Sequence, residues 1–178
     1  MRDQLLAALI DVVPFTASDT FKIVEIGSGD GGLTEALLER FPRATIVALE
    51  PSEPERVILS ARLARFADRI DARAFTLEAL DWWDVMFGAG LVVSLLQLHA
   101  LNDAKKRYLF KAAAERLSDD GALIVGDRLR PQTLLHHLVW LKHAGFAAVD
   151  CFWMSAAHAV FGGVKQAGAS GAPLRADN

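Results

Sequence analysis

The stretch that decides the fold is Phe-Lys-Ile-Val-Glu-Ile-Gly-Ser-Gly-Asp-Gly-Gly-Leu-Thr, which runs from Phe21 to Thr34. Its first part is rich in β-branched residues, which favour a central β-strand ending near Ile26. The glycines that follow allow backbone angles and close approaches that a side chain would forbid. We expect this glycine turn to lead into a helix whose first amide groups are unpaired, so that a polar ligand can bind at the end of the strand.

Length and composition favour a single domain at 1–166, with an N-terminal helix in 1–14 and a core at 22–166. Apolar residues make up 52% of the 178 residues, yet no apolar run is long enough to span a membrane. The net charge of −3 argues against nucleic acid as the main partner, and the one cysteine fits a reducing, cytoplasmic environment. We expect 167–178, which is rich in small residues, to be a flexible tail.

Segments typical of strands and of helices alternate along the chain. Strands are predicted at 44–49, 70–75, 91–95, 122–125, 147–153 and 157–164, and helices at 33–41, 54–68, 102–117 and 133–143. In the helix at 54–68 we expect Val57, Ala61 and Ala64 to face inward. The last two strands are joined by only a few small residues and must be antiparallel to each other. The alternation predicts an α/β fold with a parallel, doubly wound sheet.

Ligands of such sheets bind beyond the carboxyl ends of the strands, where the strand order reverses. The first, second and fourth strands end at the glycine turn, Glu50 and Ser94. Gly27, Gly29 and Gly32 satisfy the dinucleotide pattern, and Glu50 follows at the distance of a ribose-binding acid. A nicotinamide-dependent oxidoreductase is therefore one interpretation of the site.

Glu25, just before the first glycine, favours a different cofactor. Its carboxylate would repel a pyrophosphate, whereas it can hold the ammonium group of S-adenosylmethionine, which has no phosphate. The alternative is that Glu25 orients the glycine turn without contacting a ligand. We therefore prefer S-adenosylmethionine, with S-adenosylhomocysteine as the product.

Four parts of the chain carry motifs in a characteristic order: 24–31 (Val-Glu-Ile-Gly-Ser-Gly-Asp-Gly), 48–52 (Ala-Leu-Glu-Pro-Ser), 92–99 (Val-Val-Ser-Leu-Leu-Gln-Leu-His), and 143–146 with Asp150 and 161–165. With these motifs the chain resembles the class I S-adenosylmethionine-dependent methyltransferases over about 4–166. The resemblance implies a three-layer Rossmann-like fold. Its seven-stranded, mostly parallel sheet has the order 3-2-1-4-5-7-6 and an antiparallel last strand.

The resemblance also implies a set of cofactor-binding residues. They are Glu25, Gly27, Ser28, Gly29, Gly31, Glu50, Pro51, Thr76, Leu77, Ser94 and Leu95. The glycine turn would approach the methionine part, and Glu50 would bind both ribose hydroxyls. Pro51, Thr76 and Leu77 would border the adenine, and Ser94 and Leu95 would close the site below the reactive methyl group.

His99, just past the fourth strand, is the candidate catalytic base, because imidazole titrates near neutrality. The alternative is a cap or packing residue at the start of the next helix. The histidines at 136, 137 and 143 lack other ligands at metal-binding spacing, so no metal is expected. Cys151 alternates with aromatic residues in an apolar strand and is expected to be an inert thiol.

The main departure from the family lies after Asp127, where relatives commonly carry a long insertion that covers the acceptor, and this chain has only 128–132 before the next helix. The first hypothesis is a methyltransferase acting on a small-molecule acceptor. The second is a cofactor-binding or catalytically idle interaction module that lacks this cover. A missing cover would expose apolar surface, which suggests, as a hypothesis, a homodimer.

Overall fold

The structure is a computed structural model that describes residues 1–79, 82–129 and 133–166. The predicted tail at 167–178 and part of the short segment after Asp127 lie outside these residues. The helices and strands, with η for a 3-10 helix, are α1 (Arg2–Asp11), β1 (Lys22–Ile26), α2 (Gly32–Arg40), β2 (Thr45–Leu49), α3 (Glu53–Arg62), η1 (Ala64–Phe66), β3 (Ile70–Arg73), η2 (Trp83–Met86), β4 (Leu91–Leu95), η3 (Leu98–Ala100), α4 (Asp103–Arg116), β5 (Ala122–Arg128), α5 (Thr133–Ala144), β6 (Phe146–Ser155) and β7 (His158–Lys165).

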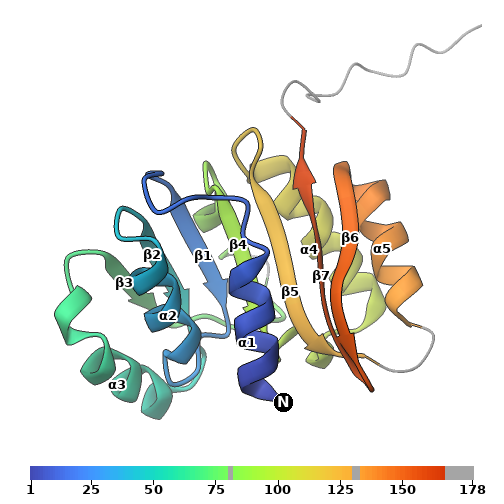
Figure 1. The fold of residues 1–178 in the computed structure, drawn as a ribbon. Helices are drawn as coiled ribbons and strands as arrows, with labels where there is room; N and C mark the ends of the chain where they lie inside the picture. Colours follow the sequence, from blue (N-terminus) through green and yellow to red (C-terminus); the bar gives the residue numbers. More distant parts are fainter. Residues whose placement is uncertain (80–81, 130–132, 167–178) are drawn as a thin grey trace, which may run out of the picture.

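The strands form one seven-stranded sheet in the order β3-β2-β1-β4-β5-β7-β6. Neighbours among β1 to β5 pair in parallel, and β7 is antiparallel to both β5 and β6. The predicted strand order and the antiparallel last strand are therefore confirmed. The carboxyl ends of the parallel strands lie along the lower edge of the sheet in Figure 1, and α1 begins at the same edge.

Helices cover both faces of the sheet (Figure 1). One buried cluster packs α1, α2 and α3 against the sheet, and it contains Leu5, Leu37 and Leu59. The other packs η2, α4 and α5 against the opposite face, with Phe110 and Leu141 among its members. Among the described residues, no helix is long and apolar enough to cross a membrane.

The backbones of neighbouring strands pack closely near the β6 edge of the sheet, where β7 lies between β5 and β6. A Cβ atom added at Gly162 of β7 would lie 2.2 Å from the carbonyl oxygen of Leu123 in β5. The absence of a side chain at this position therefore allows the two strands to approach. It also gives a physical reason for a glycine inside a strand.

The inward face predicted for α3 is wrong. Val57 is 65% exposed, and Ala61 and Ala64 are exposed as well. Leu59 and Leu63 are the buried residues, because they pack against Gly31, where a Cβ atom would lie 3.2 Å from Leu59 Cγ. The helix also ends earlier than predicted, at Arg62, and η1 replaces its last turn. Some strands also end at other residues than predicted, since β3 stops at Arg73, β5 continues to Arg128 and β6 continues to Ser155.

Candidate active site

The glycine turn after β1 uses left-handed backbone angles that favour glycine. The φ angles of Gly27, Gly29 and Gly31 are 77°, 53° and 81°. The amides of Gly27 and Ser28 donate to the carbonyl oxygen of Leu49 at 2.8 and 3.0 Å, and the amide of Gly31 donates to Ser28 O at 3.0 Å. The end of β2 therefore holds the turn in place, and most of its amide groups have partners inside the protein.

Glu50, just past the end of β2, is fixed by two backbone amides. One carboxylate oxygen accepts from Gly29 N at 2.7 Å, and the other accepts from Ser52 N at 2.8 Å. The side chain is thereby oriented across the glycine turn, and each oxygen retains a lone pair for a further donor. A diol such as a ribose supplies two such donors.

Glu25 is buried beneath the turn, with only 1% of its surface exposed. Burial raises the pKa of this carboxyl group to about 8, although the Thr34 hydroxyl, which donates to Glu25 Oε2 at 2.5 Å, and the charge of Arg2 both act to lower it. The nearby Ser28 hydroxyl is buried, and no hydrogen-bond partner for it lies within the part of the chain that the structure describes. A nearby positive charge favours the ionised form of a carboxyl group, so a ligand group with a positive charge and N–H donors would let Glu25 release its proton and pair with it.

A pocket of about 200 Å³ brings many of the predicted cofactor residues together. Its lining consists of Arg2, Glu25, Gly27, Ser28, Gly29, Leu33, Glu50, Leu95, Leu96 and Gln97. Sequence reasoning did not select Arg2 or Gln97. Gln97 packs so closely on the turn that a Cβ atom at Gly27 would lie 2.5 Å from its Cγ atom.

Other predicted residues lie outside this pocket. Pro51 and Thr76 line a neighbouring pocket of about 570 Å³, together with Trp82. Leu77 is buried in the core, and Gly31 packs under α3. The lining residues of the neighbouring pocket, in full, are Leu49, Pro51, Arg73, Ala74, Phe75, Thr76, Trp82 and Val85.

Ser94 does not present its hydroxyl to either pocket. The side chain is fully buried in β4, and its Oγ donates to the carbonyl oxygen of Ile26 at 2.9 Å. It joins the ends of β1 and β4 and so supports the floor on which the glycine turn rests.

His99 in η3 forms a pair with a carboxylate that the sequence interpretation did not select. His99 Nδ1 lies 2.8 Å from Asp127 Oδ1, and the same oxygen accepts from Arg128 N at 2.7 Å. Asp127 is only 3% exposed, whereas the His99 side chain is 34% exposed and lines a pocket of about 900 Å³. Asp127 lies at the carboxyl end of β5, so the strand-end rule that selected Glu50 could have found it.

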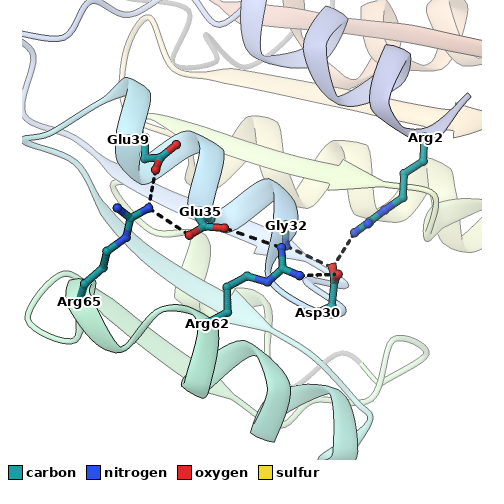
Figure 2. A network of polar contacts seen from close by, with 7 residues as sticks. All are labelled: Arg2, Asp30, Gly32, Glu35, Glu39, Arg62 and Arg65. Atoms are coloured by element: carbon teal, nitrogen blue, oxygen red, sulfur yellow. Dashed lines mark hydrogen bonds and ion pairs between the residues drawn. The ribbon is translucent and has the colours of Figure 1, made fainter.

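An ionic network surrounds the outer side of the glycine turn (Figure 2). Arg2 Nη2 contacts Asp30 Oδ1 at 2.7 Å, and Arg62 Nη2 contacts Asp30 Oδ2 at 3.1 Å. Arg62 also lies 3.7 Å from Glu35, which pairs in turn with Arg65 at 3.0 Å. The network joins α1, the turn, α2 and α3, which are distant in sequence.

The remaining candidate residues have structural partners. His137 is buried, its Nδ1 lies 2.6 Å from Thr133 O, and burial lowers the pKa of its imidazole. The Cys151 thiol has a pKa raised by burial, which makes it a weak nucleophile. No cluster of three or more metal-ligand residues occurs in the part of the chain that the structure describes.

The comparisons with known proteins agree with this geometry. A family model described as a methyltransferase domain matches residues 24–123. The chain belongs to this family. Its fold is that of the class I S-adenosylmethionine-dependent methyltransferases, so the predicted family is confirmed. No curated protein sequence matches the chain.

Several solved structures share the fold of this methyltransferase domain at low identity. An O-methyltransferase family protein from Burkholderia thailandensis is 16% identical, with a TM-score of 0.74, over 94% of this chain and 59% of that one. Human N-acetylserotonin methyltransferase, solved in complex with S-adenosylmethionine, is 17% identical, with a TM-score of 0.68, over 90% and 51%. A methyltransferase of calicheamicin biosynthesis, in its S-adenosylhomocysteine-bound form, is 16% identical, with a TM-score of 0.70, over 92% and 54%. The chain thus spans between half and three fifths of the length of these proteins.

Proposed function

We propose that the chain is an S-adenosylmethionine-dependent methyltransferase that methylates a small-molecule acceptor, with His99 as the general base. The observation that carries the proposal is that residues at and just after the carboxyl end of β4 line two pockets, one at the glycine turn and one that could hold the acceptor. Leu95 and Gln97 line the pocket at the glycine turn, and His99 lines the larger pocket beside Asp127.

The residues at the glycine turn fit the cofactor. Glu50 is held by Gly29 and Ser52 in a position to accept from both hydroxyls of a ribose. Glu25 can balance the ammonium group once it releases its proton, and the buried Ser28 hydroxyl can bind the same end of the molecule. The pocket at Pro51 and Thr76 has the position and volume for an adenine base. When bound, S-adenosylmethionine supplies a methyl group on a positively charged sulfur.

His99 is suited to remove a proton from the acceptor. An ionised carboxylate only accepts hydrogen bonds, so Asp127 would favour the tautomer of a neutral imidazole that carries its proton on Nδ1. Nε2 is then left with the free lone pair that a base requires. The second hydrogen bond, from Arg128 N, keeps the Asp127 carboxylate in place. An acceptor whose hydroxyl or amine carries a proton at neutral pH would need such a base.

The pocket beside His99 supports a small-molecule acceptor. Its volume of about 900 Å³ lies in the range of ordinary ligand sites. The similar structures include enzymes whose names denote small molecules, such as N-acetylserotonin. A base that lines this pocket and is paired with a buried carboxylate also favours catalysis over the alternative of an idle interaction module.

Calorimetry with S-adenosylmethionine tests the proposal on the full chain. We expect saturable binding that Glu50→Ala abolishes, because the variant loses the acceptor for the ribose. Glu53→Ala, an exposed acid three residues further along, is the matched control and should bind like the wild type. Absence of heat, together with an unchanged melting temperature on addition of the ligand, would contradict the proposal.

A further inference from the structure

The turn pocket contains two acidic side chains and one basic one. Glu25 and Glu50 line it, and among its described lining residues Arg2 is the positively charged one. A ligand with an amino-acid end brings both an ammonium group and a carboxylate to this pocket. Glu50, and Glu25 once it ionises beside the ammonium group, suit that group but would repel the carboxylate unless a cation lies nearby.

The backbone of the turn offers few donors for such a carboxylate. The amides of Gly27, Ser28 and Gly31 donate to carbonyl oxygens of the protein. The amide of Gly29 donates to Glu50, and that of Gly32 donates to Asp30 at 3.2 Å. In many glycine-rich turns such amides bind the anion, so here a side chain has to take over that role.

Arg2 has donors to spare. Its guanidinium group carries five N–H donors, and its described hydrogen bond is the one from Nη2 to Asp30. Figure 2 shows the side chain reaching from the start of α1 toward the glycine turn. The side chain is 49% exposed, so its position is not fixed by packing on all sides.

Asp30 does not depend on Arg2 alone. Arg62 contacts its other oxygen, and the amide of Gly32 donates to it as well. If Arg2 turned toward a ligand, the Asp30 carboxylate would keep these two partners. The cost of this rearrangement is small, because exposed ion pairs contribute little to stability.

We propose that Arg2 binds the carboxylate of the amino-acid end of S-adenosylmethionine and thereby selects a cofactor that carries this carboxylate. The inference rests on the proposed function. It assigns a binding role to a residue of the N-terminal helix, outside the glycine motif and the strand ends. It also explains why α1 begins at the same edge of the sheet as the glycine turn.

Calorimetry of the full chain with two ligands tests this role. The first ligand is S-adenosylhomocysteine, and the second is its decarboxylated analogue, which keeps the ammonium group and lacks the carboxylate. We expect Arg2→Gln to weaken binding of S-adenosylhomocysteine by roughly ten- to hundred-fold, the usual range for a hydrogen bond to a charged group. Binding of the decarboxylated analogue should change less than about twofold, and Arg2→Lys should restore part of the loss.

Arg65→Gln is the matched control, because Arg65 belongs to the same ionic network but contacts Glu35 and Glu39 rather than Asp30, and it does not line the pocket. It should leave the affinity for both ligands unchanged. Equal losses for the two ligands in Arg2→Gln would show that Arg2 only fastens α1 to the turn, and no loss for either would overturn the proposal directly. If the wild type binds S-adenosylhomocysteine with no dependence on Arg2, this inference alone fails. If the wild type does not bind it, the proposed function fails as well.

Discussion

Replacing Glu25 by glutamine is expected to stabilise the protein at neutral pH while weakening cofactor binding. The buried carboxyl group has a pKa raised to about 8, so the folded protein holds a proton that the unfolded chain releases near pH 4.5. The stabilising contribution of the neutral carboxyl group is complete below its ordinary pKa and is lost as the pH rises through the folded value. Glutamine has a similar shape and no charge, so it lacks this pH-dependent loss.

The magnitude follows from the two pKa values. Between pH 5 and pH 7.5 the free energy of unfolding of the wild type should fall by about 3 kcal/mol because of this group alone. For a chain of this size, that corresponds to a drop in melting temperature of roughly 6 to 12 °C. Any pH-independent effect of the amide, including its hydrogen bond with Thr34, cancels when the two pH values are compared.

Thermal unfolding followed by circular dichroism, without ligand, measures the effect. The melting temperature of Glu25→Gln minus that of the wild type should increase between pH 5 and pH 7.5 by the stated amount. Glu53→Gln, at an exposed position, should follow the wild type at both pH values. A difference between Glu25→Gln and the wild type that stays constant with pH would refute the idea that burial keeps Glu25 protonated.

Two further predictions concern the base and the sheet. Once an acceptor is identified, His99→Gln should lower kcat by roughly a hundredfold or more. Asp127→Asn should also lower kcat strongly, because an amide can favour the tautomer of His99 with the proton on Nε2. Wild-type rates in both variants would exclude His99 as the general base. Gly162→Ala should lower the free energy of unfolding by about 3 kcal/mol or more, measured by urea denaturation, because the new Cβ atom meets the backbone oxygen of Leu123. An unchanged midpoint would show that β5 and β7 can separate without loss.

The sheet order and the position of the site were predictable for a simple physical reason. Parallel strands end at one edge, so residues that follow separate strands, such as Gly27 and Glu50, meet there even though the chain between them is long. Asp127 obeys the same rule and could have been found. Arg2 could not, because its place beside Asp30 depends on how α1 packs across the sheet.

Local packing explains the failures. The small apolar residues of α3 formed a plausible stripe, but the space above Gly31 is filled by Leu59 and Leu63. The hydroxyl of Ser94 looked available to a ligand, yet it is used by the carbonyl oxygen of Ile26. Neither contact leaves a signal in the spacing of residues. The homodimer, which would cover apolar surface near the strand ends, stays a prediction.

The pairing of β1 with β4 has a consequence for how the protein folds. Ser94 and Ile26, which join these strands, are 68 residues apart in the chain. Contacts over such separations form slowly, because a long loop must be closed before any contact compensates for the lost entropy. The floor of the turn pocket therefore exists only after this long-range step, and ligand affinity should emerge late in refolding, after the local helices have formed.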